Sequence, residues 1–177
     1  MKAKHVLASV LVACLAACAS TPTVYTDHSP TADFSQYDSY TWSPDLQGMS
    51  PLVQERVVAA IDAQLQAKGW RRAAEGGDVT VVVRASTEAK QDVDTYYEQP
   101  MWGGWGWRNS WMYGPGYPTT TVRNYTEGTL VVDMFDTASK RAIWRGTATG
   151  TVSKDPQKNA TAVQAGLAEM FEGFPPQ

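Results

Sequence analysis

Histidine and cysteine are nearly absent from this chain. Its 177 residues include two of each, and both cysteines, Cys14 and Cys18, lie close to the amino terminus. His28 is the histidine outside the leader, and it falls in a segment that we expect to be flexible, whereas a catalytic base must be held in a fixed geometry. The sequence therefore predicts no Ser-His-Asp or Cys-His site, no zinc-ligand set and no cofactor.

Basic residues are not in excess, and long apolar runs are scarce. The formal net charge is -3, and it becomes -5 once Lys2 and Lys4 are removed with the leader. Because nucleic acids are bound by basic surfaces, no nucleic-acid partner is expected. The apolar run of residues 6–17 is too short to cross a bilayer as a helix.

The first eighteen residues have the pattern of a lipoprotein leader. A basic start at residues 2–5 precedes the apolar run, as in secretory signal peptides. Residues 15–18, Leu-Ala-Ala-Cys, resemble the lipobox of bacterial lipoprotein precursors, in which the cysteine is acylated and becomes the first residue of the mature chain. We therefore predict that residues 1–17 are a signal peptide and that Cys18 is lipidated. Three acyl chains, which the resemblance implies, would anchor the protein permanently, since one chain alone binds weakly.

Two alternatives to lipidation of Cys18 remain. Residues 11–14, Leu-Val-Ala-Cys, fit the same pattern but would leave a shorter apolar run. An ordinary cleaved signal peptide would leave Cys18 as a free thiol. If Cys18 is lipidated, Ala19 follows the anchor where some lipoproteins have aspartate. By resemblance to enterobacterial sorting, this favours the periplasmic face of the outer membrane over the inner membrane.

The remaining chain is expected to form a tether and one domain. Residues 18–32, rich in Ser, Thr and Pro, are predicted to be a flexible tether, and residues 33–177 a single domain. Helical periodicity and start signals predict a helix from Pro51 to Gly69 and another from Pro156 onward. Apolar alternation predicts strands near residues 39–42, 79–85, 93–97, 119–125, 129–135 and 141–151. The fold class is thus α+β, a mostly antiparallel sheet of about six strands with two helices packed on one face.

The hairpin of residues 129–151 has one apolar face and one mixed face. The predicted register places seven residues on the apolar face, namely Leu130, Val132, Met134, Ala142, Trp144, Gly146 and Ala148. Ile143 falls on the other face, where Asp133 is expected to pair with Arg141 or Arg145. Asp136 is expected to stabilise the turn through its side chain. An enzymatic hypothesis would instead need Asp133 and Arg145 to line a cleft.

Aromatic and glycine residues are concentrated in residues 96–118. The predicted binding residues of this loop are Trp102, Trp105, Trp107, Trp111 and Tyr113, with glycines between them. Aromatic rings combine a large apolar area with a polar edge, which suits protein interfaces, sugar faces and lipid headgroup zones. The alternative is that these rings fold over the sheet and complete the core.

Several short motifs along the chain together resemble one family. They are Asp33-Phe34-Ser35-Gln36-Tyr37, Tyr40, Trp42, Lys68-Gly69, Asp78, Glu127-Gly128-Thr129-Leu130, Asp133, Asp136, Trp144-Arg145-Gly146 and Phe174-Pro175-Pro176. This pattern, which extends from Val24 to Pro176, is similar to domain of unknown function 4136, a group of bacterial envelope lipoproteins. The resemblance implies a location and a fold but no activity, and the aromatic insert departs from it.

These observations predict a non-enzymatic, membrane-anchored periplasmic lipoprotein of the bacterial cell envelope. Its partners would be the membrane, through the lipid on Cys18, and another envelope protein or glycan, through the aromatic loop. The alternative function is a small-molecule, lipid or glycan binder that uses the same loop as a lid over a pocket.

Replacement of the acylated residue tests the anchor. Cys18→Ala removes the only thiol at the lipobox, so the protein should move from the membrane pellet to the soluble periplasmic fraction. The measurement is fractionation with immunoblotting, together with mass spectrometry of the wild-type amino terminus. Unchanged pelleting of the variant would contradict the lipid anchor.

Overall fold

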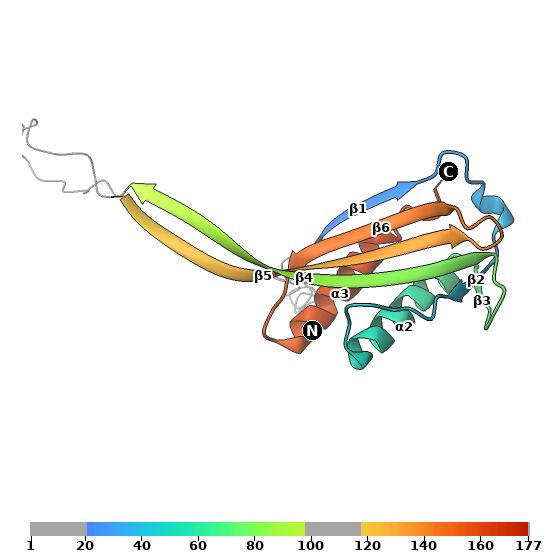
Figure 1. The fold of residues 1–177 in the computed structure, drawn as a ribbon, viewed down its shortest axis with the longest axis horizontal. Helices are drawn as coiled ribbons and strands as arrows, with labels where there is room; N and C mark the ends of the chain where they lie inside the picture. Colours follow the sequence, from blue (N-terminus) through green and yellow to red (C-terminus); the bar gives the residue numbers. More distant parts are fainter. Residues whose placement is uncertain (1–20, 98–117, 177) are drawn as a thin grey trace, which may run out of the picture.

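The computed structural model describes residues 21–97 and 118–176, which form one sheet with two helices on one of its faces (Figure 1). The sequence positions 1–20, 98–117 and 177, which include Cys18 and the five predicted binding residues of the aromatic loop, lie outside the described residues. The elements in chain order are β1 (Thr23–His28), the 3-10 helix η1 (Phe34–Gln36), β2 (Ser39–Trp42), α2 (Pro51–Ala67), β3 (Arg71–Arg72), β4 (Val79–Tyr97), β5 (Pro118–Asp136), β6 (Ala142–Thr151) and α3 (Pro156–Met170).

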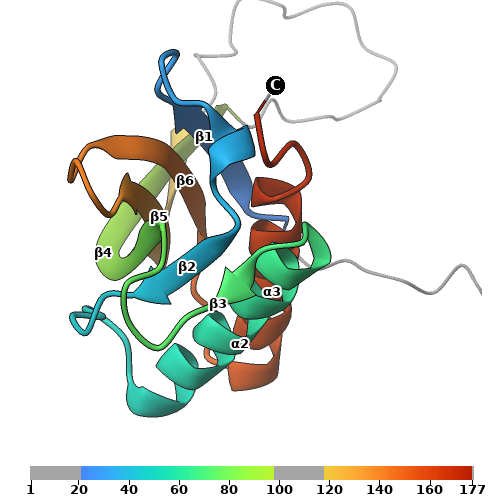
Figure 2. The same ribbon diagram turned by 90° about the vertical axis from the view of Figure 1, so that its right-hand side faces the viewer.

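The sheet has six strands in the order β1-β6-β5-β4-β2-β3. The pairs β1–β6, β6–β5 and β5–β4 are antiparallel, whereas β2 runs parallel to both β3 and β4. Helices α2 and α3 lie next to each other on the same face of the sheet, and the other face carries no helix among the described residues (Figure 2). The predicted fold class is therefore confirmed.

Two expectations about the strands are wrong. Residues 79–85 and 93–97 belong to one continuous strand, β4, and residues 119–125 and 129–135 both belong to β5. Residues 23–28, expected within the tether, form the edge strand β1, in which Val24 pairs with Ala148 of β6. The backbone hydrogen bonds that β6 offers at its free edge outweigh the polar composition of this segment.

The predicted hairpin register is confirmed over most of its length. Leu130 pairs with Ala148, and Met134 pairs with Trp144. A bulge then follows, because the next pair is Phe135 with Ala142, and Ile143 is the extra residue. The faces expected for Ala142 and Ile143 are therefore wrong. Ile143 is buried, and Ala142 is exposed.

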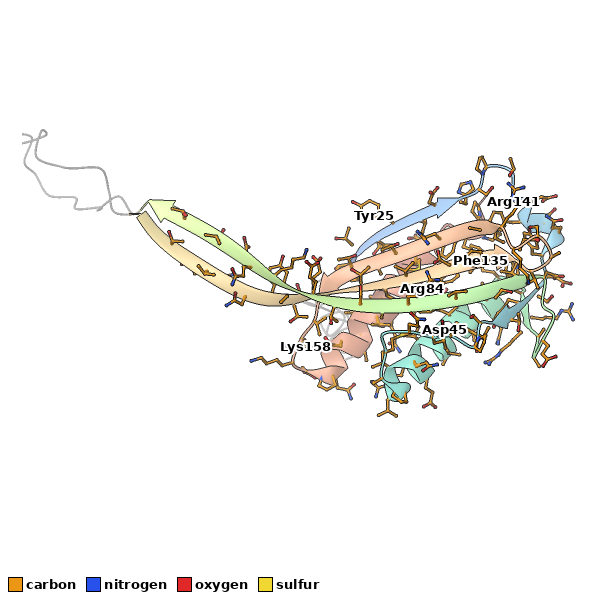
Figure 3. All side chains as sticks on the ribbon, viewed as in Figure 1. Tyr25, Asp45, Arg84, Phe135, Arg141 and Lys158 are labelled. Atoms are coloured by element: carbon orange, nitrogen blue, oxygen red, sulfur yellow. The ribbon has the colours of Figure 1, made fainter. Side chains whose placement is uncertain are left out.

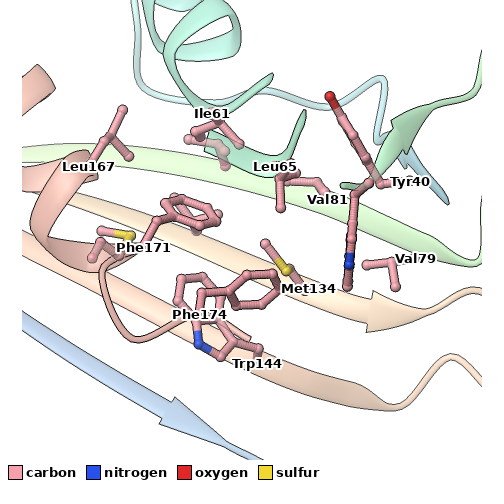
Figure 4. Packing of buried hydrophobic residues seen from close by; sticks show 14 of the residues in the cluster. Tyr40, Ile61, Leu65, Val79, Val81, Met134, Trp144, Leu167, Phe171 and Phe174 are labelled. Atoms are coloured by element: carbon pink, nitrogen blue, oxygen red, sulfur yellow. The ribbon is translucent and has the colours of Figure 1, made fainter. Parts of the chain in front are cut away.

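The core lies between the sheet and the two helices (Figure 4). In α3, the residues Leu167 and Met170 are buried, and the ring of Phe171, which follows the helix, lies 5.3 Å from that of Trp144, measured between ring centres. Gly146 lets this helix approach, since a Cβ there would lie 2.4 Å from Met170 atoms. A larger residue at this position would require the Met170 and Trp144 side chains to move.

Helix α2 begins and ends close to the predicted positions. Ser50 precedes it in extended conformation and Pro51 is its first residue, although the Ser50 side chain makes no capping hydrogen bond. Gly69 follows its end with a φ of +88°, which suits glycine. Ile61 and Leu65 are fully buried, as their spacing predicts. None of the helices in residues 21–97 and 118–176 has the length and apolar character needed to cross a bilayer.

A matched pair of leucines in α2 tests the position of the core. Leu65 is fully buried, so Leu65→Ala should lower the free energy of unfolding by about 2–5 kcal/mol. Leu52 is 66% exposed, so Leu52→Ala should change it by no more than about 0.5 kcal/mol. Urea denaturation of the soluble protein that begins at Ala19 measures both. Equal losses would contradict the orientation of α2.

Candidate contact arm and apolar groove

Strands β4 and β5 continue past the body of the domain as a two-stranded arm (Figure 1). The pairing with β6 begins at Glu127, and that with β2 covers only the start of β4, whereas β4 and β5 remain paired as far as Tyr97 and Pro118. We define the arm as residues 90–97 paired with 118–125; no third strand of the described residues flanks it. At a rise of 3.4 Å per residue, the arm is roughly 25 Å long.

Apolar and charged side chains of the arm are exposed to solvent. Val93 and Val122 are paired across the strands, and they are 57% and 53% exposed. At the base of the arm, the Lys90 ammonium lies 2.9 Å from Glu88 and 3.8 Å from Glu127, and the hydrogen bond to Glu88 raises the pKa of Lys90. An isolated two-stranded ribbon is only marginally stable in water. The arm therefore depends on the larger sheet and on whatever contacts its two free edges.

The arm also corrects the bounds of the predicted aromatic loop. Residues 96, 97 and 118 were expected in the loop but belong to β4 and β5. The five predicted binding residues belong to the segment that joins the two strands at the far end of the arm. An unbroken run of nineteen residues in β4 without glycine or proline was a sequence signal for one long strand that the two shorter predictions did not use.

An apolar groove lies at the base of the arm, between the sheet and the first turns of both helices. Its volume is about 270 Å³. Its walls come from α2, α3, β4, β5 and β6, and all of the residues that line it are uncharged. They include Pro22, Met49, Val53, Leu130, Ala148 and Val163. No sequence pattern could indicate this groove, because its walls are contributed by five separate elements.

A second hollow lies beside β2 and α2, and its acidic residue Asp62 is already hydrogen-bonded to other side chains. Asp62 lines it and accepts hydrogen bonds from Tyr40 Oη (2.6 Å), Trp42 Nε1 (2.9 Å) and Arg72 Nη1 (2.8 Å). Burial, together with the hydrogen bond to Asp62, raises the pKa of Tyr40. With its carboxylate occupied in this way, Asp62 fastens α2 to the sheet.

The other predicted polar residues stabilise the hairpin. Asp133 is only 2% exposed, and it accepts hydrogen bonds from Arg145 Nε (2.5 Å) and Nη2 (3.0 Å), as predicted, and more weakly from Arg84 Nη1 (3.4 Å). This cluster lies on the sheet face away from the helices, because Asp133 alternates with the buried residues of β5. None of the described hollows contains Asp133 or Arg145. The enzymatic hypothesis required this pair to line a cleft, and neither the apolar groove nor the hollow at Asp62 provides one.

The predicted turn of Asp136 is confirmed. Its carboxylate accepts hydrogen bonds from the Ser139 amide (2.6 Å) and hydroxyl (2.7 Å), which lower the pKa of Asp136. His28 lies at the end of β1 and is exposed, so it is not part of a tether as expected. Within the described part of the chain, no three His, Cys, Asp or Glu side chains are grouped as metal ligands would be.

The fold and the arm together define the class of this protein. It is an α+β domain with an open, mostly antiparallel sheet, two helices on one face and a projecting β-hairpin. The chain belongs to the family described as Domain of unknown function (DUF4136), whose model matches residues 24–176. The predicted family is thus confirmed. No curated protein matches the chain significantly.

Solved structures resemble the fold at low sequence identity. A PDZ domain protein from Parabacteroides distasonis matches 89% of this chain with 10% identity and a TM-score of 0.55, and this chain covers 37% of that protein. The PelC dodecamer from Paraburkholderia phytofirmans matches 85% of this chain and 95% of its own, with 12% identity and a TM-score of 0.48. A minor lipoprotein from Acinetobacter baumannii matches 77% of this chain and 91% of its own, with 9% identity and a TM-score of 0.35. The first of these likenesses is one of fold alone.

Two Arg–Asp pairs of different burial test the role of Asp133. Arg145→Met leaves the buried Asp133 carboxylate with Arg84 at 3.4 Å as its remaining partner. The free energy of unfolding should therefore fall by about 1–3 kcal/mol. Arg71 pairs with Asp38 at 2.9 Å, but both side chains are mostly exposed, so Arg71→Met should cost no more than about 1 kcal/mol. Urea denaturation compares the two variants. A larger loss for Arg71→Met would contradict this assignment.

Proposed function

We propose that this protein is a non-enzymatic lipoprotein of the bacterial cell envelope that contacts another envelope component through the aromatic segment at the end of the β4–β5 arm. The lipid on Cys18 holds it to the periplasmic face of the outer membrane. The observation that carries the proposal is the arm itself, a two-stranded extension of roughly 25 Å beside which residues 21–97 and 118–176 place no other strand.

The arm is suited to presenting a contact surface. Its strands continue the sheet of the body, so its base is fixed by the pairing with β6 up to Glu127. Its free edges offer unpaired backbone groups, which can bind an extended segment of a partner, and Val93 and Val122 add exposed apolar area. The segment that joins the two strands contains four tryptophans, the residues most enriched at the centres of interfaces.

The described residues also support a role without catalysis. The buried carboxylate, Asp133, is held by two arginines, and Asp62 is held by three donors. His28 is exposed at the end of an edge strand, and its described hydrogen bond is made by its backbone amide, which donates to the Asp27 carboxylate (2.8 Å). These groups are engaged in stabilising the fold, which leaves the aromatic arm as the feature that suits an interaction protein.

Shortening the joining segment tests the proposal. Replacing Met101–Gly116 with a two-residue Asn-Gly turn should leave the domain folded and membrane-bound, because β4 ends at Tyr97 and β5 begins at Pro118. Crosslinking in intact cells, followed by affinity purification, should then no longer capture the envelope component that the wild-type protein captures. A matched control replaces only the four tryptophans of this segment with serine, which keeps its length.

The outcome of this experiment separates the hypotheses. Equal capture by wild type and both variants would contradict the proposed contact. Loss of folding in the shortened variant, measured by circular dichroism, would favour the alternative in which the aromatic rings complete the core.

A second candidate function is supported by the groove at the base of the arm. An uncharged cavity of about 270 Å³ suits part of an apolar small molecule or lipid. Saturable changes in tryptophan fluorescence with lipids or peptidoglycan fragments would favour this function, whereas a site for a partner protein should give none.

A further inference from the structure

Exposed apolar side chains gather at the end of the body from which the arm leaves. Leu52 and Val53 begin α2, and they are 66% and 38% exposed. Val152, which follows β6, is 38% exposed, and its amide donates to Thr126 beside the base of the arm. Tyr25, which stands on the open face of the sheet, is an exception to this grouping.

The apolar groove opens at the same end. Val53 and Val152 both line it, together with Met49 and other uncharged residues. The opposite end of the body carries the turn of residues 136–141, in which Lys140 and Arg141 are exposed, and the arm end has an exposed lysine of its own, Lys158. Figure 3 labels Lys158 at the arm end and Arg141 at the opposite end.

The chain also enters the body at this end. Thr21 and Thr23 line a hollow together with Asp92, Arg123 and Tyr125 of β4 and β5. Pro22 between them is buried and lines the apolar groove. Three residues separate the buried Pro22 from Cys18 in the sequence. At 3.3–3.6 Å per residue, the distance between Pro22 and Cys18 is at most about 14 Å.

We propose that the arm end of the body lies on the lipid surface that holds Cys18, with Leu52, Val53 and Val152 in the headgroup zone. This inference rests on the proposed lipid anchor. A short connection keeps this end close to the bilayer, and the same end has the apolar side chains and the uncharged groove that such a surface accommodates. In this orientation the turn of residues 136–141 points away from the membrane, and the arm lies along the lipid surface, because its open edges and its exposed Asp92 and Arg123 exclude it from the hydrocarbon.

Single-cysteine labelling tests the orientation. The mature chain has no cysteine other than Cys18, whose thiol is acylated, so an introduced cysteine is the only reactive one. Leu52→Cys, Val152→Cys and the control Ala138→Cys all lie at exposed positions. Each lipidated protein is labelled with a fluorophore and reconstituted into phosphatidylethanolamine and phosphatidylglycerol vesicles that contain doxyl-labelled lipid. Quenching at positions 52 and 152 should exceed that at position 138 by several-fold.

The possible outcomes distinguish this inference from the proposed anchor. Flotation with the vesicles and equal quenching at all three positions would overturn the orientation alone. Failure to float would overturn both the anchor and the orientation. The unlabelled Cys18→Ala protein serves as the reference for flotation without a lipid, and circular dichroism verifies that each cysteine variant is folded.

Discussion

The antiparallel ladder between β4 and β5 is the interaction on which the rest of the structure depends. It pairs nineteen residues of each strand, from Val79 with Asp136 to Tyr97 with Pro118. In its first half, the ladder is flanked by β2 and β6 and covered by both helices, so burial of its valines stabilises the domain. In its second half, the same hydrogen bonds continue without that cover. The body thus supplies the stability that an arm of this length lacks by itself.

Close packing of α3 connects the core to the point at which the chain leaves toward its amino terminus. Gly146 allows the helix to approach β6, and Gly166 allows Pro22 to lie against the helix, since a Cβ there would be 3.0 Å from the proline ring. Pro22 is consequently buried, and the path of the chain is set up to three residues from Cys18. Small residues in the core thereby decide which end of the domain an anchor at Cys18 would hold near a membrane.

The charged groups of the described residues mostly secure the fold. Asp62 joins α2 to β2 and β3, Asp133 joins three neighbouring strands through its arginines, and Asp136 closes a turn. Asp133, which is buried, is costly to leave unpaired, so its arginine partners are structural requirements. The proposed interaction through the arm is compatible with carboxylates that serve the fold, because binding a partner requires an exposed surface and does not require an unpaired acid or base.

The sequence by itself determined the family, the fold class, the positions of both helices and most of the β5–β6 register, because these depend on local periodicity and on motifs that are continuous in the chain. It predicted that Asp133 pairs with Arg141 or Arg145, because cross-strand neighbours follow from register, and the structure shows Arg145. It did not determine the edge strand β1, whose residues 23–28 are polar and pair only because β6 has a free edge. The bulge at Ile143 is local to the β5–β6 hairpin, but simple alternation cannot indicate it because a bulge breaks that alternation. The groove at Pro22 and the arm were decided by tertiary structure, since each requires segments that are distant in the chain to meet or to stay apart.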